Sequence, residues 1–214
     1  MWRVSTCLEL NGLSQPHKAM DPSYRERGRA VHSAAEALAH GYTPAVEPAH
    51  RGYVDGVALW YRKFEPTVVA IERRIVNRLK GLTGRLDLVA IIDGQVYIID
   101  VKTGGEAVHH KWQVALYAIL ACDDDDLWAL LQDAAGTTVL SQRQPHEIGR
   151  AVLYLSATGR PGWKVHRDPQ DLYIARAALA LVQIRHENGL LAYVDPEVPD
   201  DDAVVAQVEM QQPF

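Results

Sequence analysis

The sequence contains few cysteines and no long hydrophobic run. Two cysteines, Cys7 and Cys122, occur in 214 residues, which is too few for a four-cysteine zinc or iron–sulfur site. A membrane-spanning helix needs roughly 18 or more consecutive apolar residues, and the chain has no such run. The first twenty residues do not combine a charged start with a long apolar block, so no secretory signal is expected. We therefore predict a protein without a membrane association, with both thiols reduced, in the cytoplasm.

The composition is otherwise ordinary for a globular chain. Hydrophobic residues make up 48% and charged residues 23%, which excludes disordered and collagen-like classes. The 22 basic and 27 acidic residues give a net charge of -5, which at first argues against a nucleic-acid partner. The length predicts a single domain over residues 1–214, with a loosely held tail over about 195–214.

The spacing of apolar residues predicts one central sheet among several helices. Residues 1–20 read as an irregular lead-in with a short apolar turn. Asp21-Pro22-Ser23 reads as the start of the first helix, with a candidate cap, Pro in the first turn and Ser23-x-x-Glu26 as a capping box. The expected helices cover about 21–41, 53–64, 109–121, 127–134 and 168–187. The expected strands cover 67–76, 82–92, 95–101 and 150–156. This order of elements is typical of an α/β or α+β fold.

Two aspartates face each other across a predicted hairpin. Asp93-Gly94 is a strong two-residue turn signal, so residues whose numbers sum to 187, that is 93 plus 94, lie opposite each other. Asp87 then faces Asp100 with Cβ atoms about 4.5–5.5 Å apart, where like charges are destabilising. Lys102 lies two residues further, on the same face. Two carboxylates at a core edge need a cation to stay ionised together, and oxygen ligands suit Mg²⁺.

The same residues also allow a structural interpretation. A surface hairpin with scattered charges would leave Asp100 and Lys102 as a weak exposed ion pair. Two neighbouring signals favour a functional site instead. Gly84 precedes the first acid, where backbone could approach a ligand. Gln113 and Tyr117 lie four residues apart, on one face of the helix that follows the third strand.

The combination resembles the PD-(D/E)XK nuclease superfamily, and within it the RecB-like and phage-exonuclease branch. The resemblance rests on four elements in order between residues 27 and 117: Arg27-Gly28-Arg29-Ala30-Val31-His32, Gly84-x-x-Asp87, Asp100-Val101-Lys102-Thr103-Gly104 and Gln113-x-x-x-Tyr117. It implies an α/β, restriction-endonuclease-like fold whose central mixed sheet contains an antiparallel three-stranded meander flanked by helices. The motif core would cover about 24–121, followed by a strand and a helix over about 148–188.

The resemblance also implies a role for each matching residue. Lys102 would activate the attacking water and stabilise the developing charge on phosphate. Gln113 would orient Lys102 or bind the substrate backbone, and Tyr117 would contact phosphate or pack beside it. The ligands of Mg²⁺ or Mn²⁺ would be His32, Asp87, Asp100 and the Val101 carbonyl, with Glu72 as a further candidate. Relatives that bind an iron–sulfur cluster use four cysteines, so no cluster is expected here.

Several residues near these motifs are candidates for DNA contact. Three arginines on the first helix could grip phosphates, and two histidines and a tryptophan lie at the start of the Gln113 helix. These candidates are Arg25, Arg27, Arg29, His109, His110 and Trp112. The aromatic residues Tyr53, Trp60, Tyr61 and Phe64 could stack bases, although their helical spacing favours the core. Arg160 to Lys164 reads as an exposed basic turn that could touch DNA.

The predicted function is a metal-dependent DNA nuclease, preferably an exonuclease, that leaves 5′-phosphates on single-stranded or end-containing DNA. It would serve phage or bacterial recombination, replication or repair in the cytoplasm of a bacterial cell, with a recombinase, a single-strand-binding protein or a helicase as candidate partner. Two alternatives remain open: a structure-specific endonuclease of the same fold, and a catalytically silent nuclease-like DNA-binding or assembly subunit. The locally basic first helix reconciles DNA binding with the overall negative charge.

Overall fold

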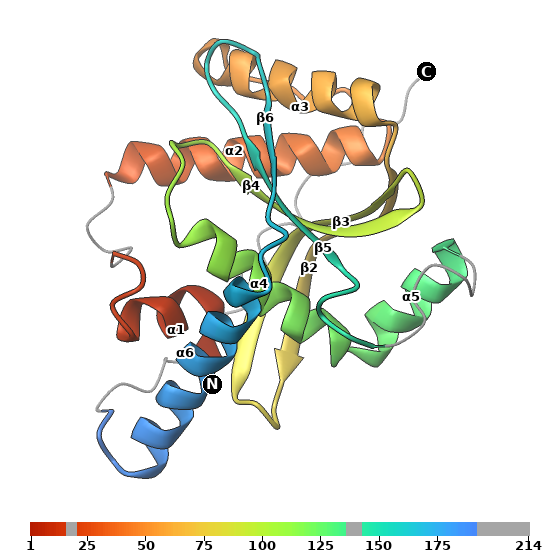
Figure 1. Ribbon diagram of the computed structural model, residues 1–214. Helices are drawn as coiled ribbons and strands as arrows, with labels where there is room; N and C mark the ends of the chain where they lie inside the picture. Colours follow the sequence, from red (N-terminus) through yellow and green to blue (C-terminus); the bar gives the residue numbers. More distant parts are fainter. Residues whose placement is uncertain (16–20, 136–142, 192–214) are drawn as a thin grey trace.

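The computed structural model describes residues 1–15, 21–135 and 143–191. These residues form an α/β fold with a mixed central sheet flanked by helices, which confirms the predicted fold class (Figure 1). The helices are α1 (Val4–Leu10), α2 (Pro22–Ala39), α3 (Arg51–Phe64), α4 (His110–Cys122), α5 (Asp125–Ala135) and α6 (Gln170–Glu187), with a short 3-10 helix η2 (Pro48–His50). The strands are β1 (Trp2–Arg3), β2 (Thr67–Asn77), β3 (Leu82–Ile92), β4 (Gln95–Lys102), β5 (Gly149–Tyr154) and β6 (Gly162–Val165).

The predicted meander forms the middle of the sheet. The order of neighbouring strands is β1-β3-β4-β5-β6, and β2 pairs with β3. β2, β3 and β4 are antiparallel neighbours, whereas β4 and β5 run parallel. Ile92 pairs with Gln95 and Leu88 with Ile99, so the register predicted from the Asp93-Gly94 turn is confirmed. β4 is buried along most of its length, which agrees with its continuous apolar sequence.

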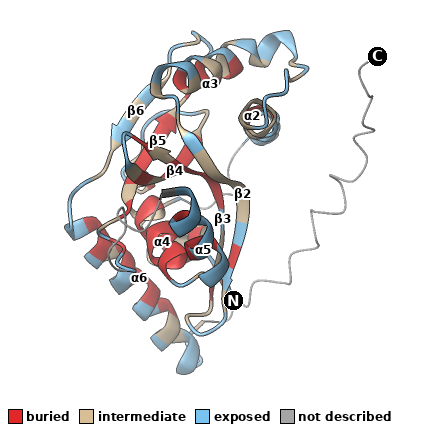
Figure 2. Cartoon of the chain, turned by 90° about the vertical axis from the view of Figure 1, so that its right-hand side faces the viewer, coloured by how far each residue is buried: buried red, intermediate tan, exposed pale blue. Residues whose placement is uncertain are grey.

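Helices cover both faces of the sheet and enclose two separate cores. α1, α4 and α6 pack on one face, and α2 and α3 pack on the other (Figures 1 and 2). α4 is the most buried helix, with buried residues on all sides, because it lies between the sheet and α6. Within the part of the chain that the structure describes, no helix is long and apolar enough to cross a bilayer.

β2 and β3 are irregular at one level of the sheet, where their side chains switch from one core to the other. Leu86 packs into the core beneath α4, whereas Leu88, two residues further, packs into the core beneath α2 and α3. In a regular strand these two side chains would share a face. At the same level, Glu72 of β2 has a left-handed backbone with φ of 47°, which is strained for a residue other than glycine. This irregularity lies opposite Asp87, because Ile71 pairs with Leu88 and Arg73 with Leu86.

Three local predictions are wrong. The N-terminal residues are not irregular, because α1 buries Val4, Cys7 and Leu8 against α4 and α6. The predicted start of α2 at Asp21-Pro22 is confirmed, but Asp21 is the N-cap and accepts a hydrogen bond from the Ser23 amide at 2.9 Å, so the Ser23 capping box is wrong.

The third error concerns Arg160 to Lys164, which does not form a basic turn. Residues 162–165 form β6, and the Trp163 ring lies 5.5 Å from Trp60 and 5.4 Å from Phe64. The aromatic side chains of α3 are therefore core residues here, with Trp60 fully buried. The tail over 195–214 falls outside the described residues.

Candidate active site

The predicted acids and lysine lie at the C-terminal end of β4, which His32 of α2 and Gln113 of α4 both reach. Asp100 and Lys102 point toward α4, and Val101 between them packs into the core beneath α2. The backbone pairing of β3 with β4 ends at Leu88 and Ile99. Beyond that point the Val101 amide has a side-chain acceptor in place of a backbone carbonyl, because it donates to Asp87 Oδ2 at 2.7 Å.

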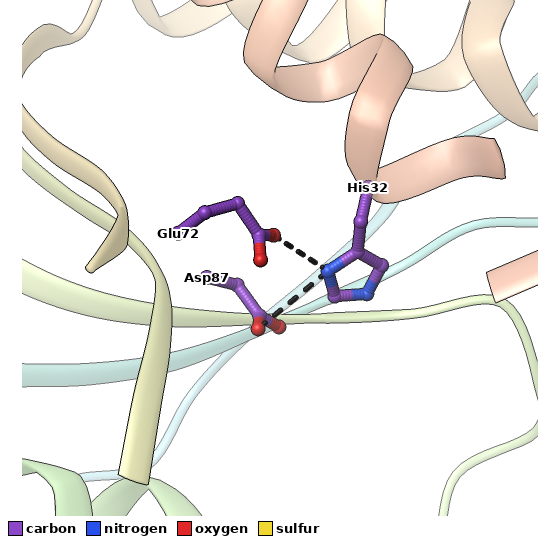
Figure 3. A group of neighbouring side chains, drawn as sticks. All are labelled: His32, Glu72 and Asp87. Carbon is purple, nitrogen blue, oxygen red and sulfur yellow. Dashed lines mark hydrogen bonds and ion pairs between the residues drawn. The ribbon is translucent and has the colours of Figure 1, made fainter. Parts of the chain in front are cut away.

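His32 reaches this site from α2 and touches three acceptors. Its Nδ1 lies 2.9 Å from Glu72 Oε1 and 3.6 Å from Asp87 Oδ1, as Figure 3 shows. Its Nε2 lies 3.1 Å from the Val101 carbonyl oxygen. Since carboxylates and carbonyls only accept, both ring nitrogens would carry protons in this arrangement, and a bound cation would take the place of one of them. Burial opposes the charge of the doubly protonated ring, but Asp87 and Glu72 outweigh burial and raise the pKa of His32 to about 9.

Two side chains donate hydrogen bonds to Asp100. Lys102 Nζ donates to Oδ1 at 3.1 Å, and Gln113 Nε2 donates to the same oxygen at 3.1 Å. Asp100 is only 1% exposed, so burial, together with the charge of Asp87, raises the pKa of its carboxyl to about 6, against the opposing effect of Lys102. Burial alone would lower the pKa of Lys102, but Asp100 and Asp87 reverse this and raise it. Lys102 is therefore a cation.

Tyr117 and Gly84 complete the α4 side of the site. Gln113 Nε2 also donates to the Tyr117 hydroxyl at 3.2 Å, so Tyr117 helps to orient the amide that holds Asp100. A Cβ atom at position 84 would lie 2.7 Å from Tyr117 Cε1. The group that approaches the backbone at Gly84 is therefore the Tyr117 ring, rather than the ligand that the sequence suggested. Burial, with Asp100 and Asp87, raises the pKa of Tyr117 well above its ordinary value.

Glu72 joins the site because of the irregularity in β2. Its Oε1 contacts His32, and its Oε2 pairs with Arg85 Nε at 2.9 Å. Sequence reasoning kept Glu72 as a weaker candidate and assigned no role to Arg85. The available signal was the spacing of Arg85 and Asp87, because residues two apart on a regular strand point to the same face of the sheet.

The donor set suits a hard divalent cation. One ligand atom from each of His32, Glu72 and Asp87 can be chosen so that all lie within 4.8 Å of one another. Asp100 Oδ2 is buried and has no hydrogen-bond partner, although Lys102 Nζ lies 2.9 Å away in an ion pair. Carboxylates and a carbonyl are the ligands that Mg²⁺ and Mn²⁺ prefer. The residues present therefore fit such an ion.

The DNA-contact candidates lie in three different environments. Arg25 and Arg29 are exposed on α2. Arg27 is half-buried, and its Nη2 donates to the Thr103 carbonyl oxygen at 2.9 Å, directly after Lys102. Trp112 packs partly against the core. These placements keep the arginines near the site and make Trp112 largely structural.

The two adjacent histidines differ from each other. His109 is half-buried, with its ring centroid 4.5 Å from that of His110. His110 is 6% exposed and lies 3.0 Å from the Tyr154 hydroxyl. Burial, followed by the charge of Lys102, lowers the pKa of His110 to about 3, so its ring is neutral. The phosphate contact predicted for His109 and His110 stays a prediction, which His110 would make as a neutral N–H donor.

The sequence of the chain matches one known protein family. The sequence model of the PD-(D/E)XK nuclease superfamily matches residues 42–188. Among solved structures, the chain is similar to a candidate exonuclease from Eubacterium rectale, with 12% identity and a TM-score of 0.46 over 98% of this chain and 82% of that one. It is also similar to the alkaline exonuclease LHK-Exo from Laribacter hongkongensis, with 9% identity and a TM-score of 0.36 over 87% and 88%. No curated protein matches the chain at a significant level.

Proposed function

The chain belongs to the PD-(D/E)XK nuclease superfamily, and we propose that it is a Mg²⁺- or Mn²⁺-dependent DNA exonuclease that leaves 5′-phosphates. The observation that carries this proposal is the convergence of Asp87, Asp100 and Lys102 at the end of β4. Two buried acids beside a lysine ammonium are costly for stability. Such an arrangement is typical of a site that binds a cation and a phosphate.

The proposed roles follow from the contacts. His32, Asp87, Asp100 and the Val101 carbonyl would hold the cation, with Glu72 as a further ligand from β2. When bound, the cation would supply Lewis-acid activation of water and neutralise charge on phosphate. Lys102 would position the water and donate to the phosphate oxygens as charge develops. Gln113 would keep Asp100 oriented, and Tyr117 would keep Gln113 oriented.

The surrounding basic residues would bind the DNA backbone. Arg25 and Arg29 are exposed on the same helix as His32, and Arg27 contacts the loop that follows Lys102. Phosphate contacts of this kind fix the register of DNA without reading its sequence. We place the enzyme in phage or bacterial recombination, replication or repair in the cytoplasm, acting with a recombinase, a single-strand-binding protein or a helicase. This setting rests on the superfamily alone.

A DNA-cleavage panel tests the proposal. Linear and circular DNA, each single- and double-stranded, would be incubated with Mg²⁺ or Mn²⁺ and the wild type, Lys102→Ala or Lys63→Ala. Lys63 is an exposed lysine on α3 and serves as the matched control. We expect the wild type and Lys63→Ala to degrade linear DNA from its ends to products with 5′-phosphates, and Lys102→Ala to be inactive. Cleavage of circular DNA would support the endonuclease alternative, and equal inertness of all three proteins would contradict the enzyme proposal.

A further inference from the structure

Arg27, beside the candidate active site, contacts the rings of two tyrosines. Arg27 Cζ lies 4.8 Å from the centroid of the Tyr24 ring and 5.1 Å from that of Tyr53, within the range of a cation–π contact. The same guanidinium donates through Nη2 to the carbonyl oxygen of Thr103, next to Lys102. The stack is therefore tied to the loop that leaves the site.

The two tyrosines differ in exposure. Tyr53, on α3, packs partly against the core beneath α2 and α3 and supports the guanidinium from within. Tyr24, in the first turn of α2, is 50% exposed. A large aromatic ring that is half open to solvent, yet held by a fixed cation, offers a rigid apolar surface at little entropic cost on binding.

The position of the stack matches a short stretch of nucleic acid. Tyr24 and His32 are eight residues apart on one helix, which corresponds to about 12 Å along its axis. One or two nucleotides therefore separate a phosphate at the His32 site from a base at Tyr24. Arg27 lies between them on the helix, and its bond to the Thr103 carbonyl connects Tyr24 to the loop that follows Lys102.

We propose that Tyr24, supported by Arg27 and Tyr53, is a stacking platform for an unpaired nucleobase one or two nucleotides from the scissile phosphate. This inference rests on the proposed nuclease function and adds a substrate class to it: DNA whose strand is unpaired at the site. A base inside a duplex is covered on both faces by its stacked neighbours, whereas an unpaired base offers a face regardless of sequence. The platform thus selects for single strands without selecting a sequence.

The test is a binding measurement in which the DNA stays intact. Lys102→Ala is the background, and single-stranded and blunt duplex oligonucleotides carry 2-aminopurine, whose fluorescence falls on stacking. Tyr24→Leu should bind single strands about 5- to 150-fold more weakly, the range that one base–aromatic stack gives, with loss of the quenching. Tyr24→Phe keeps the ring and should retain affinity and quenching. Tyr42→Leu, at the other end of α2 and also exposed, should leave both unchanged.

Three results would overturn the inference: unchanged single-strand binding in Tyr24→Leu, an equal loss for blunt duplex, or a loss in Tyr24→Phe as large as in Tyr24→Leu. Thermal unfolding of each variant identifies a folding defect, and Tyr24→Phe remains informative if Tyr24→Leu does not fold. Because binding is measured without cleavage, these outcomes are separate from the DNA-cleavage panel. An enzyme that cleaves DNA but is indifferent to Tyr24 would contradict the platform alone.

Discussion

Replacing Gly84 with alanine is expected to separate β3 from α4 at the candidate site. The new Cβ would lie 2.7 Å from Tyr117 Cε1 and 3.1 Å from Val4 Cγ2, well inside the roughly 3.5–4.0 Å optimum for two carbons. Tyr117 is buried, and its hydroxyl is bound by Gln113, so the ring cannot move away freely. Overpacking of this kind costs about 1–3 kcal/mol, which for a chain of this size lowers Tm by about 2–12 °C.

The measurement is thermal and urea unfolding of Gly84→Ala beside Gly28→Ala. A Cβ at Gly28, inside α2, meets no heavy atom within 4 Å, so this control should gain about 0.5–1 kcal/mol from the helix propensity of alanine. Tyr117→Ala removes the clashing ring, and the double variant should therefore lose less stability than the sum of the single changes. DNA cleavage should fall in Gly84→Ala because Gln113 moves with Tyr117. An unchanged Tm in Gly84→Ala, or strictly additive losses in the double variant, would refute the reasoning.

Three further predictions concern the metal, the thiols and a buried histidine. Mn²⁺ should raise the Tm of the wild type in a concentration-dependent way, because it binds only the folded site, and should raise that of His32→Ala less; equal shifts would contradict a role for His32 in binding. Burial raises the pKa of Cys7 and of Cys122 to about 12, so both thiols should react with a disulfide reagent only on unfolding, and rapid reaction of the native protein would contradict their burial. The pKa of His110, about 3, lies below its ordinary value of 6.5, so the unfolded chain binds the proton first and stability should fall as pH drops below 6.5. In His110→Gln, the free energy of unfolding measured with urea should fall less between pH 6.5 and 4. An unchanged dependence of this free energy on pH would show that other groups cause the fall.

The sequence predicted the centre of the fold because its signals there are local. The Asp93-Gly94 turn determines the register of β3 and β4, and the alternation of apolar residues follows from that register. α1 and β6 were missed for the opposite reason. α1 has seven residues and is stable through contacts with α4 and α6, and β6 depends on pairing with β5 and on the packing of Trp163. Contacts between distant segments leave little trace in either local sequence.

The candidate site was predicted to a similar extent. Asp100, Lys102 and Gln113 come together because strand alternation and helical spacing place them on one side of β4. Asp87 does not pair with Asp100 as the register predicted, because the pairing of β3 with β4 ends at Leu88 and Ile99, and its side chain binds the Val101 amide instead. The left-handed backbone at Glu72 could not be foreseen, because a positive φ is uncommon for residues other than glycine and glutamate does not favour it. The packing of Leu86 and Leu88 into different cores could not be foreseen either, because it depends on the helices that cover the two faces of the sheet. The roles of these residues in catalysis remain predictions.

The Val101 amide provides a spectroscopic probe of the site. Its proton is bound by a side chain, Asp87 Oδ2, beyond the last backbone pair between β3 and β4. Its protection from hydrogen exchange should therefore depend on the state of one carboxylate rather than on the cooperative opening of the sheet. In an NMR titration with Mg²⁺, this resonance should shift more than those of the amides of β3 and β5. Because its acceptor is a candidate metal ligand, the Val101 amide would report whether the site is occupied.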